Sequence, residues 1–295
     1  MRSFLLVLLV LAQLLPGQQQ PLSEEKKEDE PDFYCPMDKD IRQKNPGRCP
    51  RCGMALLVGI PEPVEFHVDL ELKPRPARPG APVEMAFRVE DPKSGQTVRQ
   101  FEIVHEKLFH LFLISEDLEY FAHEHPDFDE KQGIFRFRTS LPKAGAYRVL
   151  SDFFPAGSVP QMHVRTLYVP GKAEKPKPLQ PDVSPQQSVN LNVELTMEPA
   201  EPLAGFKTLM FFRLSPKHGK PFQLEPFLGA WGHMLAASQD LIDLVHTHPF
   251  LADGGPQVQF NMIFPREGIY RVWVQFQSRG EVNTVAFNIP VKALR

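Results

Sequence analysis

The feature that most constrains this chain is an internal repeat at a fixed spacing. A shift of 123 positions places FHLFLISEDLEYFAHEHP (Phe109–Pro126) on GHMLAASQDLIDLVHTHP (Gly232–Pro249) without a gap. The same shift superimposes Phe137 on Phe260, Pro142 on Pro265, Gly145 on Gly268, and Tyr147-Arg148-Val149 on Tyr270-Arg271-Val272. Similarity of this kind indicates a duplication. The main body of the chain is therefore expected to be two copies of one domain.

Each copy is predicted to be an antiparallel β-sandwich. Short apolar-polar alternating segments are separated by turn signals, such as Asp91-Pro92-Lys93-Ser94-Gly95 and Pro142-Lys143-Ala144-Gly145. The expected strands of the first copy are Phe66–Leu72, Val83–Val89, Phe109–Ile114, Phe135–Thr139, Tyr147–Phe153 and Val164–Val169. About seven strands at this spacing favour an immunoglobulin-like fold. The predicted fold class is mainly β, with a small metal-knuckle module followed by two tandem sandwiches.

Composition divides the chain into six segments. Residues 1–20 combine Arg2 with an apolar run from Phe4 to Leu15, a pattern that predicts a secretory signal peptide. We further expect a charged tether at 21–32, a metal module at 33–59, sandwich copies at 60–170 and 188–295, and a Pro- and Lys-rich linker at 171–187. An apolar run of about a dozen residues is shorter than the roughly 20 that span a bilayer. No transmembrane span is therefore expected in the mature chain, which we expect to be secreted or periplasmic.

All three cysteines of the chain lie in the expected metal module. Cys49 and Cys52 have the C-x2-C spacing at which one tight turn presents two thiolates to one ion. Asp38 follows Cys35 at the same spacing, so a second turn would present a thiolate and a carboxylate. Three cysteines cannot all pair as disulfides in an oxidising compartment. Thiolates held by a metal therefore account for them better than one disulfide with a spare thiol, the alternative.

Two methionines and one glycine accompany the cysteines. Met37 and Met54 each lie two residues after a cysteine and offer thioethers at the edge of the site. Thioether and thiolate together suit Cu(I) and other soft ions. Gly53 follows Cys52, where a residue without Cβ permits a positive φ and a tight turn toward the ligand.

This segment resembles the heavy-metal-binding domain of copper-transporting ATPases and periplasmic efflux proteins, whose pattern is Y-x-C-P-M-H-P followed by C-P-x-C-G-M-x-L. The matching residues are Cys35-Pro36-Met37, Pro46-Gly47, Cys49-Pro50, Cys52-Gly53-Met54 and Leu56, and the resemblance covers only residues 33–57. The tyrosine, Tyr34, is adjacent to Cys35 rather than two residues before it, and Asp38 replaces the histidine of the pattern. The duplicated remainder of the chain resembles no recognised family.

The ligand set leaves the metal and its role open. A carboxylate at Asp38 is harder than imidazole and should favour Zn(II) relative to Cu(I). Alternatively Asp38 does not coordinate, which leaves three sulfurs with a methionine or water. A structural zinc knuckle and an exchangeable copper or zinc site are both compatible with these residues.

The repeat also duplicates a histidine triplet. His123 and His125 are two residues apart, so on a strand both point to the same face, and His110 lies on the preceding expected strand. The second copy repeats the triplet as His233, His246 and His248. Three imidazoles from adjacent strands make a plausible Cu(II) or Zn(II) site. The alternative is a structural corner, because an H-x-H-Pro sequence at a strand end can fix a turn.

The two triplets are not equivalent in sequence. The first copy adds His105 and the pair Met162-His163, which the second lacks at the corresponding positions. We therefore expect the first copy to bind metal more tightly.

These observations favour an extracytoplasmic heavy-metal-binding protein for copper or zinc, in metal capture, buffering or resistance. The net charge of −3 without a basic stripe predicts no nucleic-acid partner. No serine nucleophile motif, phosphate loop or HExxH sequence is present, so we expect no enzyme. A membrane efflux or envelope protein is a candidate partner. The alternative is a secreted adaptor of two immunoglobulin-like domains with a structural zinc knuckle.

Overall fold

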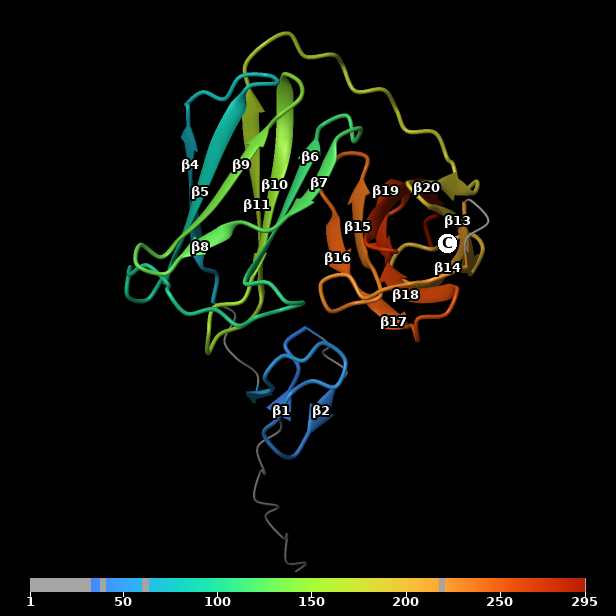
Figure 1. The fold of residues 1–295 in the computed structure, drawn as a ribbon, viewed down its shortest axis with the longest axis horizontal. Helices are drawn as coiled ribbons and strands as arrows, with labels where there is room; N and C mark the ends of the chain where they lie inside the picture. The colour runs from blue at the N-terminus through green and yellow to red at the C-terminus, as the bar shows by residue number, and fades with distance from the viewer. Residues whose placement is uncertain (1–32, 38–40, 60–63, 218–220, 295) are drawn as a thin grey trace, which may run out of the picture.

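The structure, a computed structural model, describes residues 33–37, 41–59, 64–217 and 221–294 (Figure 1). All regular secondary structure in these ranges is β, which confirms the mainly β fold class. The expected signal peptide, the charged tether and Asp38 lie outside the described residues. In the part of the chain that the structure describes, no helix is long and apolar enough to cross a membrane.

The N-terminal module is a three-stranded antiparallel sheet in the order β2-β1-β3. Its strands are β1 (Phe33–Tyr34), β2 (Arg42–Gln43) and β3 (Leu57–Val58). Cys35, Cys49 and Leu56 form its buried centre, which is too small to hold a large apolar core. Small domains of this kind depend on cross-links or metals for stability.

The first repeat is a sandwich of two four-stranded antiparallel sheets, ordered β4-β5-β9-β8 and β11-β10-β6-β7. Its strands are β4 (His67–Lys73), β5 (Pro82–Glu90), β6 (Phe109–Ser115), β7 (Phe121–Glu124), β8 (Asp127–Asp129), β9 (Ile134–Ser140), β10 (Gly145–Phe153) and β11 (Gln161–Val169). All six strands expected from the sequence are present, and the short strands β7 and β8 are additional. Phe87, Phe109 and Phe135 pack at the centre of the core between the sheets.

The second repeat is also a sandwich of two antiparallel sheets, a five-stranded one ordered β12-β13-β14-β18-β17 and a four-stranded one ordered β16-β15-β19-β20. Its strands are β12 (Gln186–Gln187), β13 (Leu191–Glu198), β14 (Lys207–Pro216), β15 (His233–Ser238), β16 (Leu244–Thr247), β17 (Pro249–Leu251), β18 (Gln257–Ile263), β19 (Gly268–Ser278) and β20 (Glu281–Val291). Phe212, Phe260, Phe276 and Phe287 are buried in its core.

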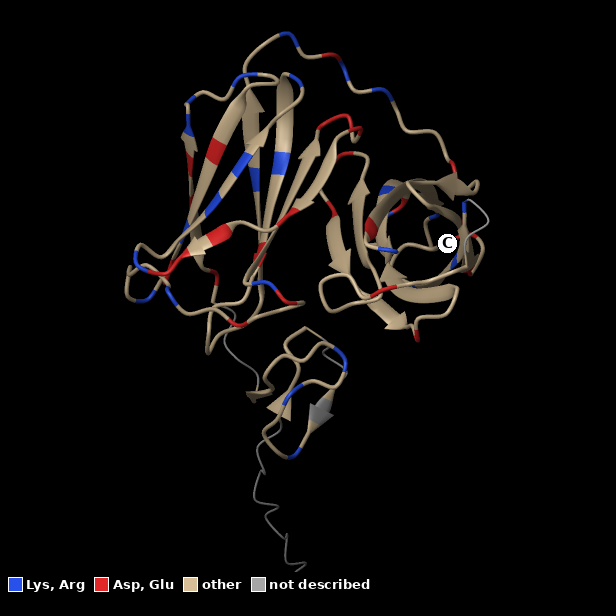
Figure 2. Cartoon of the chain, in the orientation of Figure 1, with Lys and Arg blue, Asp and Glu red and all other residues tan. Residues whose placement is uncertain are grey.

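The strands β6 and β15 are buried on both faces, whereas most other strands alternate. Every residue of β6 and of β15 is buried, and neither strand contains Lys, Arg, Asp or Glu (Figure 2). Along β6, Phe109, Leu111 and Leu113 face the core of their own sandwich, while Phe112 and Ile114 belong to a separate apolar cluster. Burial on both faces requires a second layer outside the sheet.

That second layer is the other repeat. The separate cluster joins Phe112, Ile114 and Leu150 of the first copy to Leu235 and Trp273 of the second. Phe121 stacks on Trp273 across this interface, with ring centroids 4.8 Å apart. The two sandwiches therefore pack through the outer faces of their β6 and β15 sheets (Figure 1).

The linker between the repeats contributes to this packing. Leu179 is buried in the interface cluster, and its backbone N–H donates to Gln239 Oε1 at 2.7 Å. Asp182 and Asn288 exchange backbone hydrogen bonds of 2.9 and 2.8 Å. The second half of the linker is thus bound to the second sandwich.

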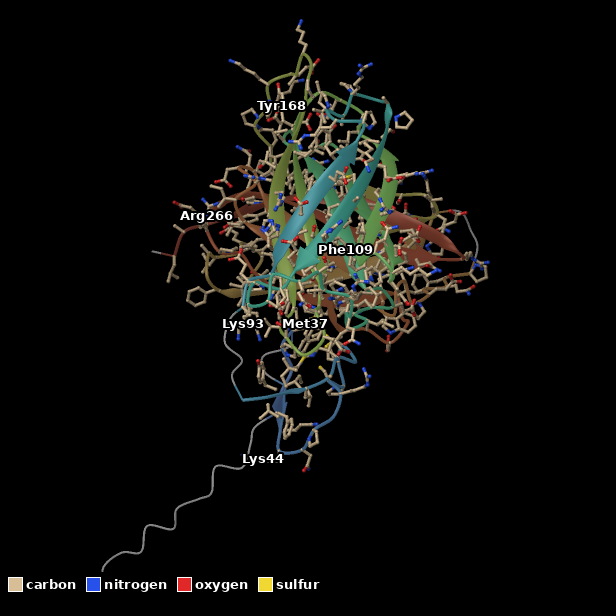
Figure 3. The ribbon with its side chains drawn as sticks, turned by 90° about the vertical axis from the view of Figure 1, so that its left-hand side faces the viewer. Met37, Lys44, Lys93, Phe109, Tyr168 and Arg266 are labelled. Carbon is tan, nitrogen blue, oxygen red and sulfur yellow. The ribbon has the colours of Figure 1, made fainter. Side chains whose placement is uncertain are left out.

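The metal module packs against the first sandwich next to the loop before β6. Met54 is 1% exposed and forms an apolar cluster with Val104 and Phe154, to which Met37 and Cys52 add partly buried atoms. Figure 3 shows Met37 where the module meets the sandwiches and Lys44 at the opposite end. A second contact reaches the other repeat, because the guanidinium of Arg51 lies 4.9 Å from the ring centroid of Phe250.

Candidate metal centres

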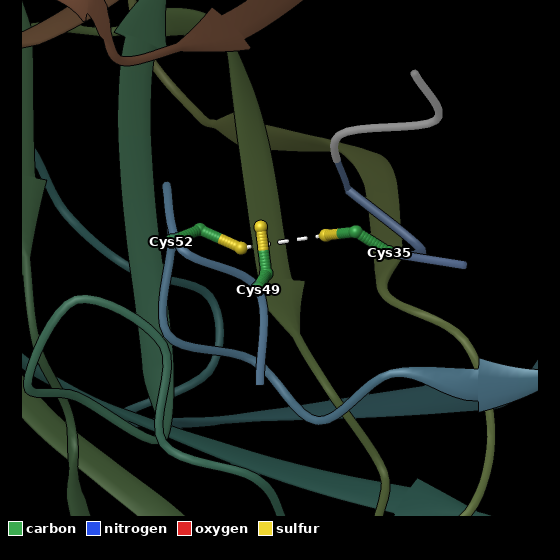
Figure 4. Close-up of side chains that lie close together, drawn as sticks. All are labelled: Cys35, Cys49 and Cys52. Carbon is green, nitrogen blue, oxygen red and sulfur yellow. Dashed lines mark hydrogen bonds between the residues drawn. The ribbon is translucent and has the colours of Figure 1, made fainter. Parts of the chain in front are cut away.

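The three cysteines of the module converge (Figure 4). Their Sγ atoms all lie within 4.8 Å of one another, and Cys35 Sγ is 3.5 Å from Cys52 Sγ. A disulfide would place two sulfurs about 2.05 Å apart. Two thiolates bound to one tetrahedral zinc ion at about 2.3 Å lie about 3.8 Å apart. The sulfurs are therefore spaced as metal ligands rather than as a disulfide.

Local backbone hydrogen bonds hold the cysteines in this position. The N–H of Cys49 donates to Met54 O at 2.7 Å, and the N–H of Gly53 donates to Cys49 O at 2.9 Å, which closes the turn between the two knuckle cysteines. Gly53 has φ +75°, which confirms the positive φ expected from its position. The N–H of Cys35 donates to Ile41 O at 2.9 Å and anchors the other turn.

Burial and mutual proximity favour a cation among these thiols. The neighbouring Cys35 thiol, followed by burial, raises the pKa of the Cys52 thiol. Three thiolates cannot share this space without a positive charge, because each repels the next. A bound soft or borderline cation reverses this effect and holds all three thiolates deprotonated. Cys35 and Cys49 are 0% and 2% exposed while Cys52 is half-buried, so Cys52 marks the accessible side of the cluster.

The other residues expected at this site lie in different places. Met37 is partly buried and packs against the cysteine cluster. Met54 is buried between the module and the first sandwich, where it packs with Val104 and Phe154. Asp38 lies outside the described residues.

In the first repeat the predicted triplet comes together at one end of the β6–β7 pair. His110 lies on β6, His123 on β7 and His125 just after β7. His110 Nδ1 is 3.1 Å from His123 Nε2 and 3.2 Å from His125 Nε2. Outside the triplet, His110 Nε2 bonds to Val104 O at 3.0 Å, and His123 Nδ1 bonds to Gln275 Oε1 at 2.8 Å.

The second repeat reproduces this geometry with His233 on β15, His246 on β16 and His248 directly before β17. His233 Nδ1 is 3.1 Å from His248 Nε2. His233 Nε2 bonds to Phe227 O at 2.8 Å, and His246 Nδ1 bonds to Asp152 Oδ2 at 2.8 Å. Each triplet keeps its ligand nitrogens within 4.8 Å of one another.

The two triplets meet at the interface between the repeats. The ring centroids of His123 and His233 are 5.4 Å apart, and those of His110 and His246 are 5.9 Å apart. The distance between the two triplets is thus similar to the 5.4 Å between His110 and His123 within one triplet. What the sequence presents as two separate sites is one contiguous cluster.

The assignment of His105 to the first copy's site is wrong. His105 stacks on His248 with ring centroids 3.6 Å apart, so it lies against the triplet of the second copy. The reason is that the loop before β6 crosses the interface. His163 lies on β11, two strands from β6, where burial lowers its pKa. Neither His105 nor His163 lies with the first copy's triplet, so they do not support the expectation that the first copy binds metal more tightly.

Burial lowers the pKa values of five of the clustered imidazoles. It lowers the pKa of His110 to about 4 and that of His125 to about 3, with the other histidines adding repulsion. The pKa values of His123, His233 and His248 are also well below the ordinary value, again because of burial. These five imidazoles are therefore neutral at pH 7, the state in which imidazole binds metals.

The sequence analysis missed the residues that orient the histidines. The carbonyls of Val104 and Phe227, and the side chains of Gln275 and Asp152, accept hydrogen bonds from them. The repeat places these acceptors at equivalent positions, because the shift of 123 positions takes Val104 to Phe227 and Asp152 to Gln275. It does not show that Asp152 and Gln275 each accept a hydrogen bond from a histidine of the other copy.

These features define the class of the protein, a heavy-metal-binding module joined to a duplicated β-sandwich. Residues 33–57 match the family described as "Heavy metal binding domain". Residues 64–169 and 187–293 each match the family described as "Domain of unknown function (DUF8832)". Because these two matches cover more than half of the chain, the protein belongs to that family.

Other comparisons add little on function. No curated protein matches the chain significantly. Similar solved structures include the Escherichia coli adhesin FdeC, at 12% identity and a TM-score of 0.27, over 81% of this chain and 68% of that chain. The Yersinia pseudotuberculosis adhesin InvE has 10% identity and a TM-score of 0.23, over 76% of this chain and 60% of that chain. TM-scores this low carry no argument about this protein.

Proposed function

We propose that this protein is an extracytoplasmic heavy-metal-binding protein that captures copper or zinc on Cys35, Cys49 and Cys52. The observation that carries the proposal is the convergence of three sulfur atoms within 4.8 Å in a domain of the heavy-metal-binding family. Soft thiolate ligands select Cu(I) and Zn(II) over hard cations. The half-buried Cys52 gives an ion a way in and out, which suits capture and buffering.

The proposed location follows from residues 1–20, whose basic start and short apolar run are typical of a secretory signal. In the periplasm or outside the cell, the protein would buffer metal or hand it to a membrane efflux or envelope protein. The role is one of binding rather than catalysis. Fractionation of cells that express the full chain tests the location, and a purely cytoplasmic protein would contradict it.

Cobalt(II) distinguishes the thiolate site from every imidazole site, because thiolate–cobalt charge transfer absorbs strongly in the near ultraviolet and imidazole–cobalt does not. Reduced full-length protein should develop this absorption with one equivalent of Co²⁺. Cys49→Ser and Cys52→Ser should each abolish most of it, while circular dichroism of the sandwiches stays unchanged. The control Ser158→Ala, a change at a half-buried loop position in the first sandwich, should leave the absorption intact. Wild-type protein without any charge-transfer band would refute the proposal.

One observation favours a second function, an adaptor whose knuckle is a structural zinc staple. Cys35, Cys49 and Met54 are almost fully buried, and the module packs against the first sandwich. A structural site holds its zinc and unfolds when the metal leaves. Transfer of zinc to a competing chelator within minutes, with the fold retained, supports capture. Loss of the module's fold together with the zinc supports the staple.

A further inference from the structure

The histidine cluster has an unusual arrangement of hydrogen bonds. In each repeat, two of the three histidines bond outward to an oxygen atom, and their other nitrogens face inward. The side-chain acceptors are exchanged between the copies. Gln275 of the second copy orients His123 of the first, and Asp152 of the first orients His246 of the second.

These oxygens determine which nitrogen of each imidazole carries the hydrogen. A backbone carbonyl can only accept, so His233 Nε2 must donate to Phe227 O, and neutral His233 therefore has a bare lone pair on Nδ1. In the same way Asp152 accepts from His246 Nδ1–H, so neutral His246 has a bare lone pair on Nε2. His246 Nε2 is buried without a hydrogen-bond partner, and its side chain is only 4% exposed. A buried acceptor without a donor is costly and calls for a missing partner.

The first repeat also contains imidazole nitrogens that carry no hydrogen and point toward one another. Val104 O accepts from His110 Nε2–H, so His110 Nδ1 is bare. Gln275 Oε1 accepts from His123 Nδ1–H, while the amide nitrogen of Gln275 donates to Thr284 Oγ1 at 3.0 Å. His123 Nε2 is then bare as well, although it lies 3.1 Å from His110 Nδ1. Two lone pairs at this distance repel each other unless a cation lies between them.

The distances between the imidazole nitrogens are close to those expected around one metal ion. Nitrogens bound to one tetrahedral ion at about 2.0–2.1 Å lie about 3.3–3.4 Å apart. The nitrogen pairs here are 3.1–3.2 Å apart, within a few tenths of an ångström of that value. Outward hydrogen bonds from ligand imidazoles to carbonyl and carboxylate oxygens are also the usual second layer of metal sites.

We propose that each triplet holds one borderline divalent cation of the Zn²⁺ or Cu²⁺ type, so that the interface between the repeats is a paired metal centre. His110, His123 and His125 bind one ion, and His233, His246 and His248 bind the other. Each repeat supplies the ligands of its own ion and the side-chain acceptor that orients a ligand of the other ion. This centre is separate from the cysteine site and stands whether or not the cysteines bind metal.

The exchange of acceptors gives a distinctive test. The full chain is studied as a Cys35→Ser, Cys49→Ser, Cys52→Ser variant, so that only imidazole sites remain. Calorimetric titration with Zn²⁺, and separately with Cu²⁺, should show two ions per chain. His125→Gln and His248→Gln should each leave one ion, while the exposed His67→Gln on β4 should leave two.

Asp152→Asn then separates the paired centre from two independent sites. Asp152 lies in the first repeat, yet its loss should weaken the second repeat's ion about 10- to 100-fold and leave the first unchanged. The proposal would be overturned if the thiol-free chain bound no ion or only one, or if Asp152→Asn bound both ions with the affinities of its parent.

Electron paramagnetic resonance of Cu²⁺ bound to the wild-type chain covers the case in which the triple cysteine variant does not fold. It should show nitrogen coupling and mutual broadening of two copper signals, and a spectrum without nitrogen coupling would overturn the proposal.

Discussion

At the scale of single residues, the two histidine sites differ most in one hydrogen-bond acceptor. His246 donates to the carboxylate of Asp152, whereas His123 donates to the amide oxygen of Gln275. A carboxylate makes the imidazole a stronger metal ligand than a neutral amide does. The second repeat should therefore hold the tighter ion, the reverse of what the count of histidines suggests.

Gln275→Glu should strengthen the weaker site. The two side chains have the same length, so the introduced carboxylate can accept from His123 Nδ1 as the amide oxygen of Gln275 does. We expect the affinity of the first repeat for Zn²⁺ to rise by up to about tenfold, measured by calorimetric titration of the thiol-free chain. Gln257→Glu, an exposed change on β18, adds the same charge elsewhere and should have no effect. A weaker first site in Gln275→Glu would contradict the orienting role.

Gly53→Ala should weaken the cysteine site through the backbone alone. Gly53 has φ +75°, and an added Cβ would meet nothing within 4 Å, so the cost is the left-handed conformation itself. That cost is about 1–2 kcal/mol, which should reduce the Co²⁺ affinity of the module about 5- to 30-fold. Gly95→Ala is the matched control, because Gly95 has φ +66° in a sandwich turn with equal space. Equal affinities in the two variants would argue against the role of Gly53.

Much of the cysteine site could be predicted at this scale, and less of the histidine site. The C-x2-C spacing and Gly53 act within one turn, so their geometry depends on neighbouring residues only. The pairing of His123 with Gln275 depends on how two sheets pack, and no local pattern encodes that contact. For the same reason the sequence associates His105 with the triplet of its own repeat, whereas its ring stacks on His248 of the other.

At the scale of elements, the packing of β6 against β15 places the two triplets together. His110 lies on the same outward-facing side of β6 as Phe112 and Ile114, so the cluster continues the apolar interface. The strands themselves follow from alternation in the sequence, and the six expected in the first repeat are all present. The interface was not predicted, although the apolar run 111–114 of β6 is the kind of pattern that strands buried on both faces show.

Trp273→Ala tests the interface. The Trp273 ring is 4% exposed and stacks on Phe121 of the other repeat. Removal of this ring should lower the free energy of unfolding by about 3–5 kcal/mol, measured by urea denaturation. Tyr168→Ala on the edge strand β11 removes a ring that is 61% exposed and should cost much less. A loss below about 1 kcal/mol for Trp273→Ala would mean that the interface contributes little.

At the scale of the whole molecule, the buried histidines with lowered pKa values should make the metal-free protein sensitive to acid. The folded pKa of His110 is lowered to about 4 and that of His125 to about 3, against about 6.5 in the unfolded chain. Between pH 6.5 and about 4 the unfolded chain therefore binds protons that the folded chain does not. The free energy of unfolding falls as pH falls, by about 1.4 kcal/mol per pH unit for each such histidine.

Urea denaturation of metal-free protein at pH 7 and pH 5 measures this effect. The midpoint should be clearly lower at pH 5, and His125→Gln should reduce the difference because one proton-binding group is gone. An unchanged or higher midpoint at pH 5 would show that the imidazoles of the folded protein bind protons between pH 7 and pH 5 as readily as those of the unfolded chain.

The most direct test of the account is a count of metal ions by native mass spectrometry of the reduced full chain after loading with Zn²⁺. The account predicts three ions in the wild type, one on the cysteines and one on each histidine triplet. It predicts two in the Cys35→Ser, Cys49→Ser, Cys52→Ser variant and one when His125→Gln is added. The central claim is that this is a metal-binding protein with a thiolate site. It would be contradicted if the wild-type chain carried no zinc, or if the triple cysteine variant carried as many zinc ions as the wild type.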